Sequence, residues 1–277
     1  MKNYLIILIT IVSTNTYCQE NSVFWKIEKD SIKSYILGTN HIFGEDFIKK
    51  KYILSFTLKK SEIVLIENIE NATTIINSRK AFHYIDSLSI IQNKILKENI
   101  IDKKVSIEKL TIRELYLFTE IYWDKLSCLN KNEKENKSTM DTYIMEYSQS
   151  KKKTIIGLEN ISETLNFIET GFLEKVDEVK IIGSLKFKLD AISKNYIHNK
   201  CTINNLYRDK KYKFDFSSNI KDGLMLTRNK NWLPKIISAL ETKKTVFIAV
   251  GVAHLDYKSG LITLLQEKGY AITPIQF

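Results

Sequence analysis

Residues 35–41 read YILGTNH, and residues 246–254 read VFIAVGVAH. Each stretch is a short apolar run of β type, followed by a glycine, two further residues and a histidine. A glycine where a strand ends lets the backbone turn sharply, because it has no Cβ to clash. The histidine then stands at the carboxyl end of the strand, which is the edge where open α/β sheets bind their ligands.

The chain contains only four histidines, and two of them follow this pattern. Two unconnected surface loops are the ordinary explanation of such motifs, but their repetition favours one shared site that contains His41 and His254. Neutral imidazole is the commonest transition-metal ligand and the usual general base near neutral pH. The other two histidines, His83 and His198, have no strand before them, and we interpret them as residues of surface or interior helices.

The length and composition indicate a globular protein with a sizeable core. The chain has 277 residues, of which 44% are hydrophobic and 11% aromatic, and this suits one large domain or a domain with an insertion. Its formal net charge is +10, but the basic residues are scattered and do not form a stripe on one face. No nucleic-acid-binding motif accompanies them, so we expect no nucleic-acid partner and interpret the charge as a source of solubility.

The first eighteen residues have the form of a signal peptide. Lys2 supplies the positive start, and residues 4–12 form an unbroken apolar run that is too short to span a bilayer. We predict cleavage before Gln19 and export to the periplasm or the medium, with no integral membrane segment in the mature chain. A lipoprotein anchored at Cys18 is less favoured, because the three residues before it do not fit the small-residue pattern of lipidation signals.

Two cysteines, Cys128 and Cys201, remain after this cleavage. Their spacing is not that of a Cys-x-x-Cys metal site. In an oxidising compartment they could form a disulfide, and the alternative is two partly buried thiols. The sequence leaves both possibilities open.

The ends of the chain carry β/α patterns, whereas its middle is mainly helical. The expected elements are a hairpin (23–27 and 33–37), helices (46–60, 111–124, 164–182 and 260–268), strands (62–67, 153–157, 246–250 and 270–275) and a polar loop (130–139). This order predicts an α/β fold whose central sheet is formed by both ends of the chain, with a large helical insertion that caps the sheet edge. We expect one domain over residues 19–277, with 19–72 and 241–277 as its α/β core and 73–240 as the insertion.

Further polar side chains could complete a site with the two histidines. Glu67 ends one predicted strand, and Glu159 follows another in the same way. Asp141 lies early in a helical stretch, and Arg228 and Asn229 lie within a later helix. Each of these has an ordinary interpretation when taken alone, as a strand terminator, a helix N-terminal acid or a solvated helix face.

Taken together, these residue types can bind a divalent metal ion and activate water. A carboxylate that is not a ligand can then act as the base, and an arginine can stabilise a developing oxyanion. The same residues could also run acid–base hydrolysis from histidine and glutamate alone, without a metal ion.

Six pieces of the sequence, in order, point to a known family. They are WKI at 25–27 with YILGTNH at 35–41, EIVLIE at 62–67, MD at 140–141 with IGLEN at 156–160, LTRN at 226–229, VGVAHL at 250–255, and SGLITLL at 259–265 with KGY at 268–270. In this register they resemble the TraB/GumN family, which includes the pheromone-shutdown proteins and is related to the Tiki proteases of animals. The resemblance implies an α/β sheet with a helical insertion.

The animal relatives are described as metal-dependent proteases that use the two Gly-x-x-His histidines. By this resemblance His41, Glu67 and His254 would be ligands of a divalent metal ion, namely Mn²⁺, Co²⁺ or Zn²⁺. Glu159 would be the base or a further ligand, and Arg228 would clamp an oxyanion or a substrate carboxylate. Asn229 and Asp141 would be supports that orient the ligands.

The sequence therefore predicts an exported metal-dependent hydrolase, with peptide cleavage as the leading reaction on a peptide or small-molecule substrate. Two alternatives stay open, a non-catalytic protein that binds a small ligand or peptide signal, and a metal-independent His/Glu hydrolase. Because only neutral imidazole binds metal, the metal affinity is expected to fall as the pH drops through about 6.5, the ordinary histidine pKa.

Overall fold

The computed structural model describes residues 22–172, 176–219 and 223–277. The predicted signal peptide and its cleavage site before Gln19 lie outside these residues. The described chain forms an α/β architecture with one mixed sheet of six strands, as the sequence predicts. Among the described residues, no helix is both long enough and apolar enough to cross a membrane.

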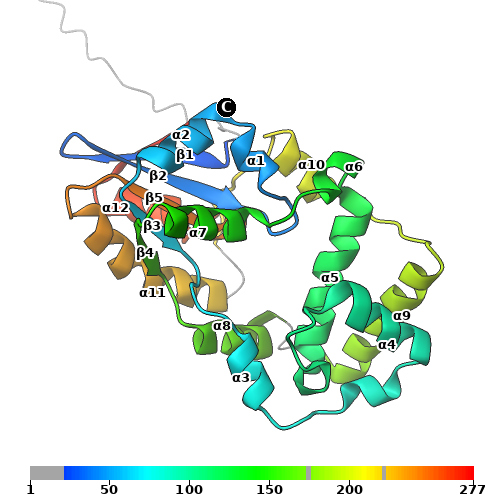
Figure 1. Ribbon diagram of the computed structural model, residues 1–277. Helices are drawn as coiled ribbons and strands as arrows, with labels where there is room; N and C mark the ends of the chain where they lie inside the picture. Colours follow the sequence, from blue (N-terminus) through cyan, green and yellow to red (C-terminus); the bar gives the residue numbers. More distant parts are fainter. Residues whose placement is uncertain (1–21, 173–175, 220–222) are drawn as a thin grey trace, which may run out of the picture.

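The sheet brings together strands from both ends of the chain and one strand from its middle (Figure 1). The strands are β1 (Phe24–Lys29), β2 (Ile32–Thr39), β3 (Ile63–Ile66), β4 (Thr154–Gly157), β5 (Val246–Gly251) and β6 (Ala271–Pro274). Their order is β4-β3-β5-β2-β1-β6, in which β4, β3, β5 and β2 are parallel and β1 is antiparallel to both β2 and β6. All four residues of β3 are buried, as is usual for parallel strands that are covered on both faces.

Helices cover both faces of this sheet (Figure 1). The helices α1 (Asp46–Lys49), α2 (Tyr52–Lys60) and α7 (Met140–Ser150) lie on one side, and α11 (Gly223–Leu240) and α12 (Leu261–Glu267) lie on the other. The single helix predicted over 46–60 is divided in two, because Lys51 takes an extended conformation between α1 and α2. Two of these helices, α7 and α11, come from the middle of the chain and contribute buried residues such as Met140 and Trp232 to the sheet core.

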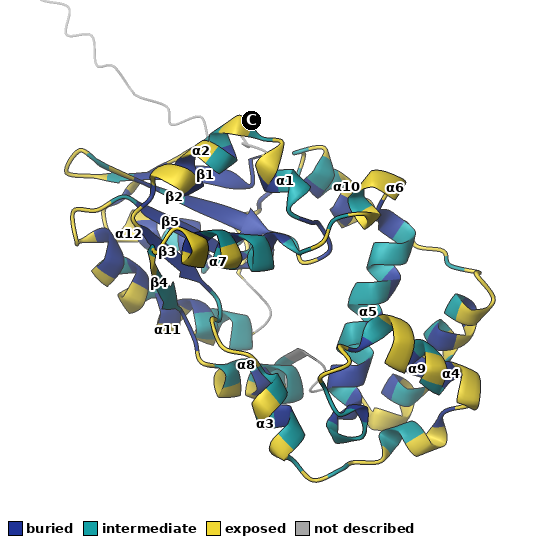
Figure 2. Cartoon of the chain, viewed as in Figure 1, coloured by how far each residue is buried: buried dark blue, intermediate teal, exposed yellow. Residues whose placement is uncertain are grey.

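The rest of the middle forms a helical lobe beyond the carboxyl ends of the parallel strands (Figure 1). Its elements are α3 (Thr73–Ser78), η1 (Tyr84–Ser87), α4 (Ile90–Ile95), η2 (Leu96–Ile100), η3 (Ile107–Lys109), α5 (Ile112–Cys128), α8 (Ile161–Phe167), η4 (Ile168–Phe172) and α9 (Glu178–Ser193). The lobe has its own hydrophobic cluster, which is separate from the sheet core, and Figure 2 shows both buried interiors. The predicted helix 164–182 is therefore not continuous, since α8 ends at Phe167 and α9 begins at Glu178.

Local sequence signals explain where several lobe helices begin. Thr111 and Glu114 form a capping box at the start of α5, each side chain bonding to the other's backbone N–H. Asn130 and Glu133 do the same for the short helix α6 (Lys131–Lys134), which interrupts the predicted polar loop 130–139.

A disulfide joins Cys128 to Cys201, with their Cα atoms 5.4 Å apart, so the two cysteines pair rather than remaining as thiols. Cys128 ends α5, and Cys201 directly precedes α10 (Thr202–Arg208). The helix α10 is bound to the sheet in turn, because the Tyr207 hydroxyl donates to the Gly38 carbonyl oxygen at 2.7 Å. The disulfide therefore tethers the long helix of the lobe to the sheet.

Candidate active site

The four parallel strands end side by side, and each is followed by a predicted site residue. Thr39 pairs with Gly251, and Ile66 pairs with both Ala249 and Gly157, so the strand ends are level with one another. His41, Glu67, Glu159 and His254 follow β2, β3, β4 and β5 respectively, with His254 closing the 3-10 turn η5 (Val252–His254). Parallel strands thus bring residues from four distant parts of the chain to one edge of the sheet.

The two Gly-x-x-His turns contact each other, and this contact explains their glycines. A Cβ on Gly38 would lie 2.9 Å from the Cα of Val252 in the second turn. A Cβ on Gly251 would lie 3.2 Å from Glu67 Oε1, 3.7 Å from His254 Cδ2 and 3.8 Å from His41 Nε2. A side chain at Gly38 would thus meet backbone of the second turn, and one at Gly251 would displace the Glu67 carboxylate from its present position. The three predicted metal ligands meet around the second glycine, where the Gly251 N–H also donates to Glu67 Oε1 at 2.6 Å.

Arg228, on α11, lies at the centre of this cluster and donates to three of its members. Its Nη2 donates to Glu67 Oε2 at 3.0 Å and to Glu159 Oε1 at 2.7 Å, and its Nε donates to Glu159 Oε2 at 2.9 Å. Its Nη1 lies 3.1 Å from His254 Nε2. The guanidinium is held between the rings of Phe167 and Trp232, with centroids 4.4 and 4.7 Å away. Burial disfavours its charge, but the hydrogen bonds and charges of the two glutamates raise the pKa of Arg228.

Glu159 is buried and its carboxylate is saturated with donors. Besides the two bonds from Arg228, Oε1 accepts from the Thr164 hydroxyl at 2.8 Å and Oε2 accepts from the Trp232 indole N–H at 3.2 Å. Such a carboxylate holds Arg228 in a fixed plane by two parallel bonds. Its geometry is that of an anchor for the guanidinium.

His254 is held by Asn229, the neighbour of Arg228 on α11. The Asn229 amide nitrogen donates to the carbonyl oxygens of His254 and Ser259, which fixes its orientation and turns its oxygen towards His254 Nδ1 at 2.6 Å. Because an amide oxygen only accepts, Nδ1 carries the proton and Nε2 presents its lone pair to Arg228. The ring also stacks on Trp232, with centroids 4.3 Å apart.

His41 is held in the same way by Asp141, at the start of α7. Its Nδ1 lies 3.0 Å from Asp141 Oδ2, while Oδ1 of the same carboxylate accepts from the Thr39 hydroxyl at 2.7 Å. Surrounding protein disfavours the charged ring, but the hydrogen bond and charge of Asp141 and the charge of Glu67 outweigh this and raise the pKa of His41 from 6.5 to about 9. His41 is therefore protonated at neutral pH.

Glu67 has the opposite shift. Burial raises the pKa of its carboxyl, but electrostatic interactions with His254, Arg228 and His41, together with the Gly251 N–H, lower it to about 2. The carboxylate is ionised across the physiological range and faces both histidines.

The donor atoms of His41, Glu67 and His254 are of the kind that bind Mn²⁺, Co²⁺ and Zn²⁺. Asp141 and Asn229 hold the Nδ1 atoms of the two imidazole rings, as the supports of metal-binding histidines do. Their present placement differs from that of a metal site. Among the described residues, no three histidine, cysteine or acidic side chains are arranged to hold an ion. Arg228 also faces the lone pair of His254 Nε2 and donates to one oxygen of Glu67.

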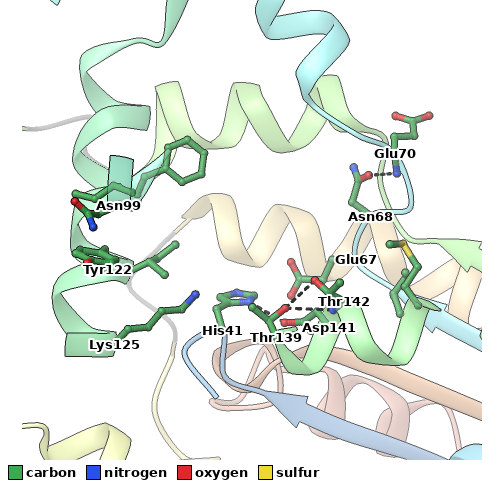
Figure 3. A pocket seen from close by; sticks show the side chains of 15 residues that line it. His41, Glu67, Asn68, Glu70, Asn99, Tyr122, Lys125, Thr139, Asp141 and Thr142 are labelled. Carbon is green, nitrogen blue, oxygen red and sulfur yellow. Dashed lines mark hydrogen bonds and ion pairs between the residues drawn. The ribbon is translucent and has the colours of Figure 1, made fainter. Parts of the chain in front are cut away.

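The cluster borders a cavity of about 500 Å³ between the sheet edge and the helical lobe (Figure 3). Its lining includes His41, Glu67, Thr139, Asp141 and Thr142 from the sheet side, and Asn99, Phe118, Ile121, Tyr122 and Lys125 from the lobe. Arg228, Asn229 and His254 are not part of this lining; Asn229 and His254 are buried, and the half-buried Arg228 lines a separate cavity together with Glu159 and Trp232. His83 and His198 are exposed and take no part in this lining. The interpretation of both as helix residues is wrong, because His83 precedes η1 in a left-handed conformation and His198 lies in the connection between α9 and α10.

Sequence reasoning found the cluster but not its surroundings. Trp232, Phe167 and Thr164 position Arg228 and Glu159, and Asn99, Tyr122 and Lys125 form the opposite wall of the cavity. None of them follows a strand end or belongs to a motif, so the sequence offered no signal for them beyond helical periodicity.

Comparison with known proteins gives one match. The model of the TraB/PrgY/gumN family matches residues 23–274, which is most of the chain. No curated protein and no solved structure matches the sequence.

Proposed function

This chain belongs to the TraB/PrgY/gumN family, and from that membership we propose that it is an exported hydrolase that cleaves peptides with a divalent metal ion. The ion, Mn²⁺, Co²⁺ or Zn²⁺, would be held by His41, Glu67 and His254. The observation that carries the proposal is the meeting of these side chains around Gly251, beside a cavity large enough for a peptide segment.

The state of the cluster favours a metal ion over metal-free acid–base hydrolysis. Both oxygens of Glu67, Glu159 and Asp141 already accept hydrogen bonds. His41 carries a proton at neutral pH, and His254 Nε2 faces an Arg228 donor. Within the described part of the cluster, no side chain offers an unengaged base. A metal ion that replaced the proton on His41 would remove the need for such a base, because water bound to the ion is itself readily deprotonated.

When bound, such an ion supplies a Lewis acid and an activated water. The chain's own residues would orient the reaction: Asp141 and Asn229 fix the two imidazole rings, and the anchor Glu159 sets the plane of Arg228. Ligation would require Arg228 Nη1 to release His254 Nε2, because that nitrogen has a single lone pair, whereas Glu67 Oε2 has a second one to offer. The released Nη1 could then donate to the oxyanion of a cleaved amide.

Two observations support export. The apolar run before Gln19 has the length of a signal segment. The Cys128–Cys201 disulfide is of a kind that persists outside the reducing cytoplasm. N-terminal sequencing of the mature protein should begin within two residues of Gln19, and a mature chain that starts at Met1 would contradict export.

The metal proposal is tested by calorimetric titration of the purified protein with Mn²⁺, Co²⁺ and Zn²⁺, paired with hydrolysis of a broad peptide library. Wild type should bind one ion, and His41→Ala or His254→Ala should abolish both binding and hydrolysis. Because the proton on His41 competes with the ion and its pKa is about 9, affinity should rise about tenfold per pH unit from pH 7 towards pH 9. If His41 had the ordinary histidine pKa, the metal affinity would instead stop rising near pH 6.5.

The matched controls are His83→Ala and His198→Ala, which remove exposed histidines away from the cavity and should change neither measurement. Hydrolysis by wild type without any metal binding would replace the metal proposal by the His/Glu mechanism. Peptide binding without hydrolysis or metal binding would favour a non-catalytic binding protein.

A further inference from the structure

The wall of the cavity opposite the cluster carries three polar side chains that face the open space. Asn99 lies in η2, and Tyr122 and Lys125 lie one turn apart on α5. In Figure 3 the Lys125 ammonium points across the cavity towards His41. In the described part of the chain, no side-chain hydrogen bond or ion pair engages any of the three.

Lys188, which lies in the same lobe and is also half-buried, provides a contrast because its ammonium pairs with Glu120 at 2.8 Å. Three acids line the cavity, and none of them pairs with Lys125. Glu67 pairs with Arg228, Asp141 pairs with His41, and Glu70 accepts from the Ile161 backbone N–H at 2.7 Å. Lys125 is partly buried, and burial lowers the pKa of its ammonium. A partly desolvated cation with no internal partner gains most from a ligand that brings an anion.

The position of Lys125 between two cavities indicates the shape of the ligand. A second cavity of about 290 Å³ adjoins the first, and both are lined by Tyr122, Lys125 and Thr139. The second cavity continues past residues 133–138, where Lys134 and Lys137 contribute further positive charge. Lys125 thus lies where the two cavities meet, and a ligand that reached from one cavity into the other would be an extended chain rather than a compact small molecule.

We propose that Lys125, together with the Tyr122 hydroxyl and the Asn99 amide, binds a carboxylate of the peptide substrate and so makes the protein selective for acidic peptides. This inference rests on the proposed peptidase function. It moves the recognition of a substrate carboxylate from Arg228 to the helical wall. The Nε and Nη2 atoms of Arg228 already donate to Glu67 and Glu159, and its Nη1 faces His254. The carboxylate could come from an acidic side chain or from the C-terminus of the peptide.

Two matched probe pairs separate these sources. The first pair is a tripeptide with both ends blocked and a central glutamate or glutamine, and the second is a blocked trialanine with a free or an amidated C-terminus. Binding to the full-length mature protein is measured by NMR titration, which does not depend on turnover. In at least one pair the acid should bind about tenfold more tightly than the amide, since hydrogen bonds to charged groups are the stronger class.

Lys125→Met keeps the aliphatic stem and removes the charge, so it should abolish this preference, and Lys125→Gln should do the same. Lys125→Arg should retain most of it. The control Lys244→Met removes an equal charge from an exposed position away from the groove and should leave the preference intact.

Equal binding of acid and amide in both pairs, or a preference that survives in Lys125→Met and Lys125→Gln, would overturn the inference. Its failure is separable from failure of the proposed function. Hydrolysis of the peptide library without acid preference would leave the peptidase in place and remove the role of Lys125. Acid-selective binding without hydrolysis would retain Lys125 and remove the peptidase.

Discussion

The two Gly-x-x-His turns have the same sequence pattern, yet the molecule uses them differently. His254 is only 3% exposed, stacked on Trp232 and enclosed by α11, whereas 57% of the His41 side chain is exposed to the cavity. The supports differ in kind as well, a neutral amide for His254 and a carboxylate for His41. The buried turn is therefore part of the structural core, and the open turn is the one that a substrate can reach.

The largest loss of stability should come from removing Arg228, the cation that contacts the buried turn. Arg228→Met leaves Glu67 and Glu159 without their shared partner, and an uncompensated buried charge costs about 3–5 kcal/mol. The free energy of unfolding from urea titration should fall by that amount. Lys50→Met, which removes an exposed pair with Asp46, should cost less than about 1 kcal/mol. Similar losses in the two variants would mean that the buried network is no more than a surface ion pair.

The histidines themselves provide the next comparison. His254→Ala opens a cavity beside Trp232 and leaves the Asn229 oxygen without its donor, so we expect a loss of about 2–4 kcal/mol. His41→Ala should cost less than about 1 kcal/mol, because that ring is largely exposed. Both changes should abolish hydrolysis if the proposed function is right. Equal stabilities of the two variants would remove the distinction between the turns.

The smallest effect concerns the pH dependence of the open turn. The folded-state pKa of His41 is about 9 against an ordinary value of 6.5, so its interaction with Asp141 stabilises the fold fully below pH 6.5 and is lost as the pH rises through 9. Asp141→Asn keeps a hydrogen-bond acceptor but removes the charge, and it should return the His41 pKa towards 6.5 in an NMR titration of the ring protons.

The difference in unfolding free energy between wild type and Asp141→Asn should be greatest below pH 6.5 and should vanish above pH 9. Asp46→Asn removes a carboxylate of the exposed pair with Lys50 and serves as the control, with no effect on the His41 titration. An unchanged His41 pKa in Asp141→Asn would show that the carboxylate does not control this ring.

The sheet edge was predictable from sequence because its signals are local. Apolar runs that end in glycine or in an acid define the strands β2, β3, β4 and β5, and parallel strands necessarily share one carboxyl edge. The residues that follow these strands were therefore expected to meet. The family resemblance supplied roles for Asp141, Arg228 and Asn229, each of which contacts a histidine of the site.

What the sequence determined by itself is thus the α/β fold and the identity of the residues at the sheet edge, since strand propensity and turn glycines act over a few neighbouring positions. Tertiary structure alone decided that Arg228 neutralises Glu67 across 161 positions of sequence, that Cys128 pairs with Cys201, and that Lys125 faces His41. These outcomes depend on how the helical lobe packs over the sheet. Such packing sums many weak contacts between distant segments, and no local pattern of residues records which side chains will face each other.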